Sequence, residues 1–281
     1  MLAIAPERSA PWHASLADAA REAGVPCLVP DDVNDESVLA RVADHGPELL
    51  LSVYYTQPFA PPLLDAVVGS SVNFHPSLLP RHRGVAPIVW AIAEGDRMTG
   101  LTAHYIDEEI DTGPLIVQRL LPIHPEDTGY RLHLKMAWLV RATAAELLRL
   151  FLAGESFPPG IAQSGTATHH SRRDPELNRL DWTSPRRRIQ DIVRALAPPL
   201  PGAFTLLNGQ AIVIARVELV PQTEEGRTLR PGMVELSGDG VPIVWAADGP
   251  LRLAAFADDD EIVPGQELPR RRGLLAGQVL G

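Results

Sequence analysis

The amino-acid sequence predicts an α/β protein in two parts, and two observations carry that prediction. Up to about residue 153, short apolar runs alternate with amphipathic stretches, as strands and helices do in layered α/β domains. Beyond about residue 200, short strand-like runs follow one another, separated by turn signals such as Asn208-Gly209. A stretch rich in Gly, Pro, Ser and Thr joins the two parts.

Helices are predicted in the first part where apolar residues recur every three or four positions. Ser15 is expected to cap the first helix and Asn34 the second, because their side-chain oxygens can accept from the first free N–H groups. Asp127 or Thr128 is expected to cap the last. The predicted helices span residues 16–23, 36–44, 61–68, 86–94 and 128–153.

Strands are predicted between these helices, where the apolar residues are continuous or alternate. The run at 49–54 suits a central parallel strand because both of its faces are apolar. Strand and helix in alternation indicate a mainly parallel, Rossmann-like sheet. The predicted strands span residues 26–29, 49–54, 71–74, 101–106 and 115–123.

The second part is predicted to be a small β-barrel of the OB type. A helix at 185–196 precedes it, with Ser184 as its cap and Pro185 at its first position. Five strands are predicted, at residues 203–206, 211–219, 232–236, 241–246 and 251–256. The expected boundaries are residues 1–153 for the α/β domain, 154–179 for a linker and 180–281 for the β domain.

Composition excludes several classes of protein. The 281 residues are 45% hydrophobic and 21% charged, which argues against disorder and coiled coil. The formal charge is −10, and the first 150 residues carry −8 of it, which argues against a nucleic-acid partner. Cys27 is the one cysteine, so the chain has no internal disulfide. The absence of a long apolar run and of a signal peptide predicts a cytoplasmic protein with no membrane partner.

The chemistry is expected between residues 72 and 113. Asn73 and His75 are two positions apart near the end of a predicted strand, so their side chains point to the same side. Asp111 follows the next strand in a loop. An amide, an imidazole and a carboxylate that converge there could act as oxyanion donor, proton carrier and orienting group. Taken without the rest of the stretch, an Asn-x-His pair is more often structural than catalytic.

At these residues the chain resembles the formyltransferases that use 10-formyltetrahydrofolate. The resemblance rests on motifs that occur in the order of that family. They are Asn73 and His75, Ser77-Leu78-Leu79-Pro80, Arg83-Gly84, Ala86-Pro87, Gly100-Leu101-Thr102, Asp111-Thr112-Gly113 and, downstream, Leu180-Asp181-Trp182 and Pro201-Gly202-Ala203-Phe204. The resemblance covers most of the chain.

The resemblance implies a catalytic domain at residues 1–153 and a catalytic trio of Asn73, His75 and Asp111. Asn73 and protonated His75 would stabilise the oxyanion, while Asp111 would hold the histidine charge and help to remove the amine proton. The co-substrate implied is 10-formyltetrahydrofolate, with no metal. Co-substrate-binding residues implied by similarity are Tyr54, Tyr55, Ile106, Asp107, Glu109 and Ile110, and acceptor-binding residues are Ser77, Arg83, Gly84 and Pro87. The two tyrosines could equally be core aromatics.

The chain departs from this family at its front, where about one strand and one helix are expected before the region that matches residues 2–6. Their absence would expose a sheet edge, which a homodimer would cover. The histidines outside the trio are expected in structural or surface roles. They include His82, His104 and His124, and the adjacent pair His169-His170, which is not expected to bind metal.

The acceptor implied by the resemblance is an amine, and the best-known family members formylate methionyl-tRNA. The corresponding region here, residues 7–32, has two arginines against five acidic residues, which argues against tRNA. Residues 29–34, Ser52-Val53-Tyr54-Tyr55 and the stretch with Arg172, Arg173, Pro175 and Glu176 look like the branch that formylates nucleotide-linked amino sugars. Residues 102–111 resemble formyltransferases of N-hydroxyornithine. Formyltetrahydrofolate hydrolysis and a non-catalytic binding module are the remaining alternatives.

Overall fold

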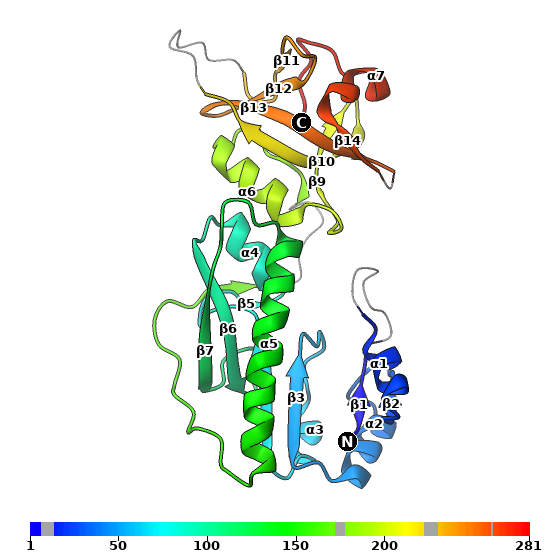
Figure 1. The fold of residues 1–281 in the computed structure, drawn as a ribbon, viewed down its shortest axis with the longest axis vertical. Helices are drawn as coiled ribbons and strands as arrows, with labels where there is room; N and C mark the ends of the chain where they lie inside the picture. The colour runs from blue at the N-terminus through cyan, green and yellow to red at the C-terminus, as the bar shows by residue number, and fades with distance from the viewer. Residues whose placement is uncertain (7–13, 172–177, 222–229, 260) are drawn as a thin grey trace. The chain divides into compact units, whose positions relative to one another are not determined.

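The computed structural model describes residues 1–6, 14–171, 178–221, 230–259 and 261–281, and it confirms the α/β prediction (Figure 1). The chain divides into two compact units. The first comprises Met1–Val85, Gly100–Leu121 and Met136–Ser171, and the second comprises Ala86–Thr99, Pro122–Lys135 and Arg172–Gly281. Three of the five divisions fall inside β6 (Met98–Tyr105), β7 (Leu115–Pro122) and α5 (Gly129–Leu152).

The first unit begins with two short parallel strands, β1 (Ala3–Ile4) and β2 (Cys27–Leu28). Three helices follow in chain order among the strands: α1 (Leu16–Glu22), α2 (Glu36–His45) and α3 (Pro61–Asp65). Side chains from β1, β2, α2 and α3 meet in one apolar cluster together with side chains from neighbouring segments. It contains Val33, Val38, Val42 and Leu63, with Ile4, Leu28, Leu50, Tyr55 and Phe59 packed against them.

The N-caps of α1 and α2 can be compared with those predicted from the sequence. Ser15 caps α1 as predicted, because its hydroxyl accepts from Asp18 N at 3.2 Å. The prediction for Asn34 is wrong: Asp35 is the N-cap of α2. The Asn34 amide binds a neighbouring loop instead, accepting from Ala60 N at 2.7 Å and donating to the Pro58 carbonyl at 3.0 Å.

The sheet that carries the site has four strands in the order β3-β4-β6-β7, and its pairing is mixed. β3 (Leu49–Val53) lies parallel to β4 (Ser70–His75), and β4 lies antiparallel to β6. This register places Asn73 opposite His104 and His75 opposite Thr102. The α5 helix follows, and Thr128 caps it by accepting from Arg131 N at 3.2 Å. Its buried side chains recur every three or four residues: Leu132, Met136, Val140, Thr143 and Leu147.

The predicted linker contains structure within its described residues. Ile161 and Leu115 form an isolated antiparallel bridge, and β8 (His169–His170) pairs in parallel with β5 (Arg83–Gly84). Neither of these two-residue strands was predicted. Arg172, Arg173, Pro175 and Glu176, which carried part of the resemblance to the amino-sugar branch, lie outside the described residues.

The second unit contains a curled antiparallel half-barrel, drawn in yellow to red in Figure 1. Its strand order is β11-β12-β13-β10-β9, with β14 paired to β13. The strands are β9 (Ala203–Leu207), β10 (Gln210–Leu219), β11 (Val234–Leu236), β12 (Pro242–Ala246), β13 (Gly249–Asp258) and β14 (Glu261–Pro264). β14, the following 3-10 turn (Gly265–Glu267) and α7 (Leu268–Arg272) were not predicted.

Helices α4 (Pro87–Ala93) and α6 (Arg186–Leu196) pack together in this unit. The Arg188 guanidinium donates to the Ala93 carbonyl, which ends α4. Pro185 is the N-cap of α6 and not its first helical residue, so the predicted start is one position early. Ile189 and Val193 face the half-barrel core, where Phe256, Leu251 and Ile214 are also fully buried. Within the described residues, no helix combines the length and the apolarity needed to cross a membrane.

Candidate active site

Strand β4 brings the two predicted polar residues to one side of the sheet. Asn73 and His75 are separated by Phe74, whose fully buried ring occupies the opposite face. His75 is itself 5% exposed, so its imidazole is almost completely removed from solvent. The strand therefore fixes both side chains before any loop contributes.

Asp111 lies against both of them, as predicted. Its Oδ1 accepts from the Asn73 amide at 3.2 Å, and its Oδ2 is 3.3 Å from His75 Nδ1. The backbone N–H of Gly84 donates to Oδ2 at 2.8 Å. The structure thus brings amide, imidazole and carboxylate together from a strand, its exit and a loop that is distant in sequence.

His104 is a fourth member of this group, and sequence reasoning assigned it a structural or surface role. It is 2% exposed, and its Nε2 lies 3.1 Å from the Asn73 amide nitrogen and 3.5 Å from Asp111 Oδ1. Its Nδ1 is 2.8 Å from the Tyr105 carbonyl, so Nδ1 carries a proton. When the ring is neutral, Nε2 therefore accepts from Asn73. The signal in the sequence was the period of two that it shares with Thr102.

The loop around Asp111 has an uncommon backbone conformation. Asp111 has φ +58°, in the left-handed region that non-glycine residues seldom adopt. Two residues later, a Cβ on Gly113 would lie 1.8 Å from the Tyr105 carbonyl oxygen, so only glycine fits. The Asp-x-Gly motif is therefore explained by two backbone requirements as well as by the carboxylate.

The electrostatics of the pair follow from burial. Burial lowers the pKa of His75 below its ordinary value, although the Asp111 charge and the His82 carbonyl act in the opposite direction. Burial acts to raise the pKa of Asp111, but His104, His75 and the Gly84 N–H together hold it below its ordinary value. The resting site at neutral pH therefore combines a charged carboxylate with an imidazole that is mainly neutral.

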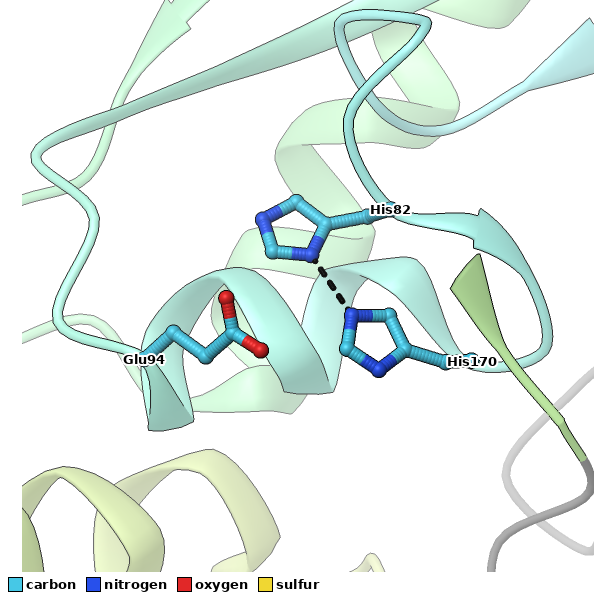
Figure 2. A group of neighbouring side chains, drawn as sticks. All are labelled: His82, Glu94 and His170. Atoms are coloured by element: carbon cyan, nitrogen blue, oxygen red, sulfur yellow. Dashed lines mark hydrogen bonds between the residues drawn. The ribbon is translucent and has the colours of Figure 1, made fainter. Parts of the chain in front are cut away.

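His82 contacts the same group through its backbone. Its carbonyl accepts from His75 Nε2 at 2.8 Å, while its own N–H donates to Thr168 Oγ1 at 2.8 Å. Its ring Nδ1 also forms a hydrogen bond with His170 Nε2, with 3.0 Å between the two nitrogens. The dashed line in Figure 2 marks this bond. The third side chain drawn there, Glu94, follows α4 in the second unit.

The residues implied for folate binding are distributed unevenly. Asp107, Glu109 and Ile110 lie on the exposed loop before Asp111, and Ile110 is 55% exposed. Ile106 is half-buried, and its backbone N–H donates a hydrogen bond to the Ser71 carbonyl. Tyr55 stacks on Phe59 at 5.5 Å in the apolar cluster. Burial raises the pKa of the neighbouring Tyr54 well above its ordinary value.

The residues implied for acceptor binding also differ in their surroundings. Arg83 binds Gln163 through its guanidinium, and Gly84 binds Asp111. Ser77 is fully buried, and its hydroxyl donates to the Arg81 carbonyl at 2.6 Å, which closes the turn that it begins. Pro87 is buried at the start of α4, in the second unit.

Comparison with known proteins agrees with this geometry. Residues 8–142 match the formyl transferase family, and residues 173–270 match the formyl transferase C-terminal domain. The chain is 33% identical to the methionyl-tRNA formyltransferase of Sorangium cellulosum (strain So ce56) over 263 residues. The aligned region covers 93% of this chain and 84% of that protein. It is 40% identical to the enzyme of the same name from Anaeromyxobacter sp. (strain K) over 195 residues. That aligned region covers 69% of this chain and 62% of that protein.

Solved structures share the fold. HypX from Aquifex aeolicus superposes with a TM-score of 0.67 at 19% identity, over 96% of this chain and 48% of HypX, so the chain spans about half of that protein. WlaRD, a sugar 3N-formyl transferase crystallised in the presence of dTDP and 5-N-formyl-THF, superposes with a TM-score of 0.66 at 19% identity, over 89% of this chain and 85% of WlaRD.

These matches show that the protein is a transferase enzyme. Its α/β sheet holds the buried His75 imidazole against a partly buried amide and carboxylate, ahead of an antiparallel half-barrel. The chain belongs to the formyl transferase family. Among the solved structures that share the fold, HypX is described in complex with tetrahydrofolic acid and WlaRD in the presence of 5-N-formyl-THF.

Proposed function

We propose that this enzyme transfers the formyl group of 10-formyltetrahydrofolate to the amine of a small-molecule acceptor, a nucleotide-linked amino sugar. The observation that carries the proposal is the meeting of the buried His75 with the partly buried Asn73 and Asp111 in one group. The trio supplies a donor for an oxyanion and a charged carboxylate beside an imidazole, which are the groups that acyl transfer to an amine requires.

The reaction balances without a metal or a redox partner. A C–N bond forms between the acceptor nitrogen and the formyl carbon, the bond to folate nitrogen N10 breaks, and the proton lost by the amine balances the one that N10 gains. Asn73 and His75 stabilise the oxyanion by hydrogen bonding. Each side chain gives up a hydrogen bond to an acceptor within the protein and donates to the oxyanion instead. Asp111 holds the imidazole and favours its charged form while the proton is in transit. The exposed Ile110, close in sequence to Asp111, offers an apolar side chain to the pterin ring.

The charge of the chain favours a small acceptor. The chain carries a formal charge of −10, and an acidic protein gains little from the phosphate contacts that supply most of the affinity for nucleic acid. The fold of WlaRD, which acts on a sugar, is compatible with such an acceptor. The proposed folate-binding residues are Tyr54, Tyr55, Ile106, Asp107, Glu109 and Ile110, and the proposed acceptor-binding residues are Ser77, Arg83, Gly84 and Pro87.

Methionyl-tRNA is the second candidate acceptor, because both curated relatives carry that activity in their names. The two candidates require different surfaces: a tRNA contacts many phosphates over a wide area, whereas a nucleotide sugar carries a single pyrophosphate. The acidic balance of residues 7–32 favours the smaller ligand. Arg8, one of the two arginines in that range, lies outside the described residues.

The test is a formyl-transfer assay with purified enzyme and 10-formyltetrahydrofolate. The acceptors are a panel of dTDP- and UDP-linked amino sugars, N-hydroxyornithine and methionyl-tRNA. We expect a formylated amino sugar, detected by mass spectrometry, and about 100- to 1000-fold slower product formation by Asn73→Ala. Formylation of methionyl-tRNA alone would overturn the proposed acceptor. Release of formate at the same rate with and without acceptor would instead indicate a hydrolase.

A further inference from the structure

Residues 161–170 lie along the loops that hold the catalytic carboxylate. Ile161 exchanges two backbone hydrogen bonds with Leu115, at 2.8 and 2.9 Å. Further on, the Thr168 carbonyl accepts from Arg83 N and the His170 carbonyl accepts from Val85 N, both at 2.9 Å. The segment therefore contacts the backbone on both sides of the carboxylate-binding Gly84.

Gln163 is the residue of this segment whose side chain enters the site. Its Nε2 donates to the Asp111 carbonyl at 2.8 Å and to the Gly113 carbonyl at 2.9 Å. Its Oε1 accepts from Arg83 at 2.6 and 3.2 Å. Because the nitrogen faces two acceptors and the oxygen faces a cation, the orientation of this amide is determined. All of its hydrogen-bonding capacity is used.

These bonds close a ring of contacts around Asp111. Gly84 N–H binds the carboxylate, Arg83 is the residue before it, and Gln163 connects Arg83 to the backbone of Asp111. Asp111 also has a left-handed backbone conformation, which persists only when its surroundings enforce it. Gln163 supplies two of the bonds that enforce it, one to each end of the Asp-x-Gly turn.

The same segment has a second link to the catalytic pair. The His82 carbonyl accepts from His75 Nε2, and His82 is held by Thr168 through its N–H and by His170 through its ring (Figure 2). Residues 161–170 therefore support both partners of the His75–Asp111 pair. Gln163 supports the carboxylate, and the other two residues support the carbonyl that faces the imidazole.

We propose that Gln163 is a positioning residue for the formyl-transfer reaction, holding Asp111 at its working distance from His75. This inference rests on the proposed function, because its predicted effects on kcat and KM are measured in the formyl-transfer reaction. Gln163 acts through the Asp111 backbone and not on the reacting atoms. Its removal should therefore displace the carboxylate, and a displacement of about 1 Å is enough to cost about 100-fold in rate. Variants that also remove the acceptor of the Arg83 guanidinium disturb a proposed acceptor-binding residue as well.

The experiment compares Gln163→Leu and Gln163→Glu with Ser164→Ala, the next residue, which is exposed. Leucine removes every bond, whereas glutamate keeps an acceptor for Arg83 but has no donor for the two carbonyls. We expect both variants to lower kcat about 10- to 100-fold. The change in KM should be far smaller in Gln163→Glu, which keeps an acceptor for Arg83, than in Gln163→Leu. Ser164→Ala should match the wild type. A wild-type kcat in Gln163→Glu would overturn the proposal, because only the donors reach Asp111.

A second readout needs no turnover. NMR titration of the His75 imidazole is expected to show a lower pKa in Gln163→Leu than in the wild type, because the nearby Asp111 charge raises it. An unchanged titration would overturn the proposal even if every formyl-transfer assay failed, so the inference and the proposed function can be refuted separately. If Gln163→Leu does not fold, Gln163→Asn replaces it with the same expected results, since its shorter amide cannot span both carbonyls and Arg83.

Discussion

Both ring nitrogens of His75 face acceptors, the His82 carbonyl at Nε2 and the Asp111 carboxylate at Nδ1. A neutral imidazole can donate from only one nitrogen, so this arrangement suits the charged ring better than the neutral one. Burial has the opposite effect and lowers the pKa. The contacts therefore favour the charged ring, whereas burial favours the neutral ring. Opposed effects of this kind set the pKa of groups that change their protonation during a reaction.

This balance predicts acid-sensitive folding. The unfolded chain has an ordinary histidine with a pKa of about 6.5, whereas the buried ring binds its proton only at lower pH. The unfolded state thus binds more protons, and the unfolding free energy should fall as the pH drops below about 6.5. Urea unfolding of the wild type and His75→Asn at several pH values from 7.5 to 5 measures it. Equal pH dependence in the two proteins would contradict the assignment to His75.

The Asn73 amide is the donor whose loss should be most costly. Asn73→Ala is expected to lower kcat by about 100- to 1000-fold, the usual effect of removing an oxyanion donor. His104→Phe should lower kcat by a smaller factor, since the ring orients Asn73 without reaching the formyl oxygen. Single-turnover kinetics of both variants check the order. A larger loss in His104→Phe would assign the oxyanion to that ring instead.

At the level of elements, sequence patterns predicted most helices and strands, including the short β2 and α3, but missed β5, β8, β14 and α7. The five helices of the first part and the strands that carry Asn73 and His104 were located because each presents several apolar positions to a core. Two-residue strands have no such period. The pairing of β5 with β8 joins residues 86 positions apart, as in Arg83↔His169, so no local signal could reveal it.

The β5–β8 pairing depends on Gly84. Its φ is +89°, and a Cβ there would lie 2.2 Å from the His170 carbonyl oxygen. Gly84→Ala is therefore expected to separate the strands, displace the N–H that binds Asp111 and lower both kcat and stability. Gly24→Ala is the matched control, because Gly24 also has positive φ but open space around its Cβ. Its cost should be about 1 kcal/mol from backbone strain alone. Thermal unfolding that ranks the two variants equally would refute the close contact.

Within the half-barrel, Trp182 connects the start of the domain to β9. Its indole N–H donates to Thr205 Oγ1 at 2.9 Å, and both residues are buried. Trp182→Phe should lower the unfolding free energy by about 1–3 kcal/mol, because the Thr205 hydroxyl is left without this partner. Trp138→Phe is the control, since Trp138 is 69% exposed and should change stability by less than about 0.5 kcal/mol. Chemical denaturation of both variants provides the comparison.

For the whole molecule, the sequence predicted the order of an α/β part and a β part but not how the chain distributes itself between compact units. Residues Ala86–Thr99 and Pro122–Lys135 belong to the second unit although they interrupt the first in sequence. Specific contacts explain this: Arg188 binds the end of α4, and Arg194 donates to the Asp127 carbonyl at 2.9 Å. Composition changes at residue 154, but contacts of this kind leave no trace in composition.

The acidic character of the chain makes a prediction about salt. With a nucleotide-linked sugar as acceptor, kcat/KM should change little between 50 and 200 mM salt. Recognition of a tRNA through 6–10 phosphate contacts would lose about 10³–10⁵ in affinity over the same range. Steady-state kinetics at three salt concentrations test this. A steep loss for a sugar acceptor would indicate that the sugar is a poor substitute for a polyanion.

The position of Gln163 has a consequence for synthesis on the ribosome and for recombination. Asn73, His75 and Asp111 all emerge early, yet the residues that support their loops emerge only with residues 161–170. A nascent chain that stops at residue 153 would contain the proposed catalytic trio without its support. In chimeras with other members of the family, the junction should therefore lie after His170. A junction at Gly154 would combine the loops of the proposed site with residues 161–170 of a different protein.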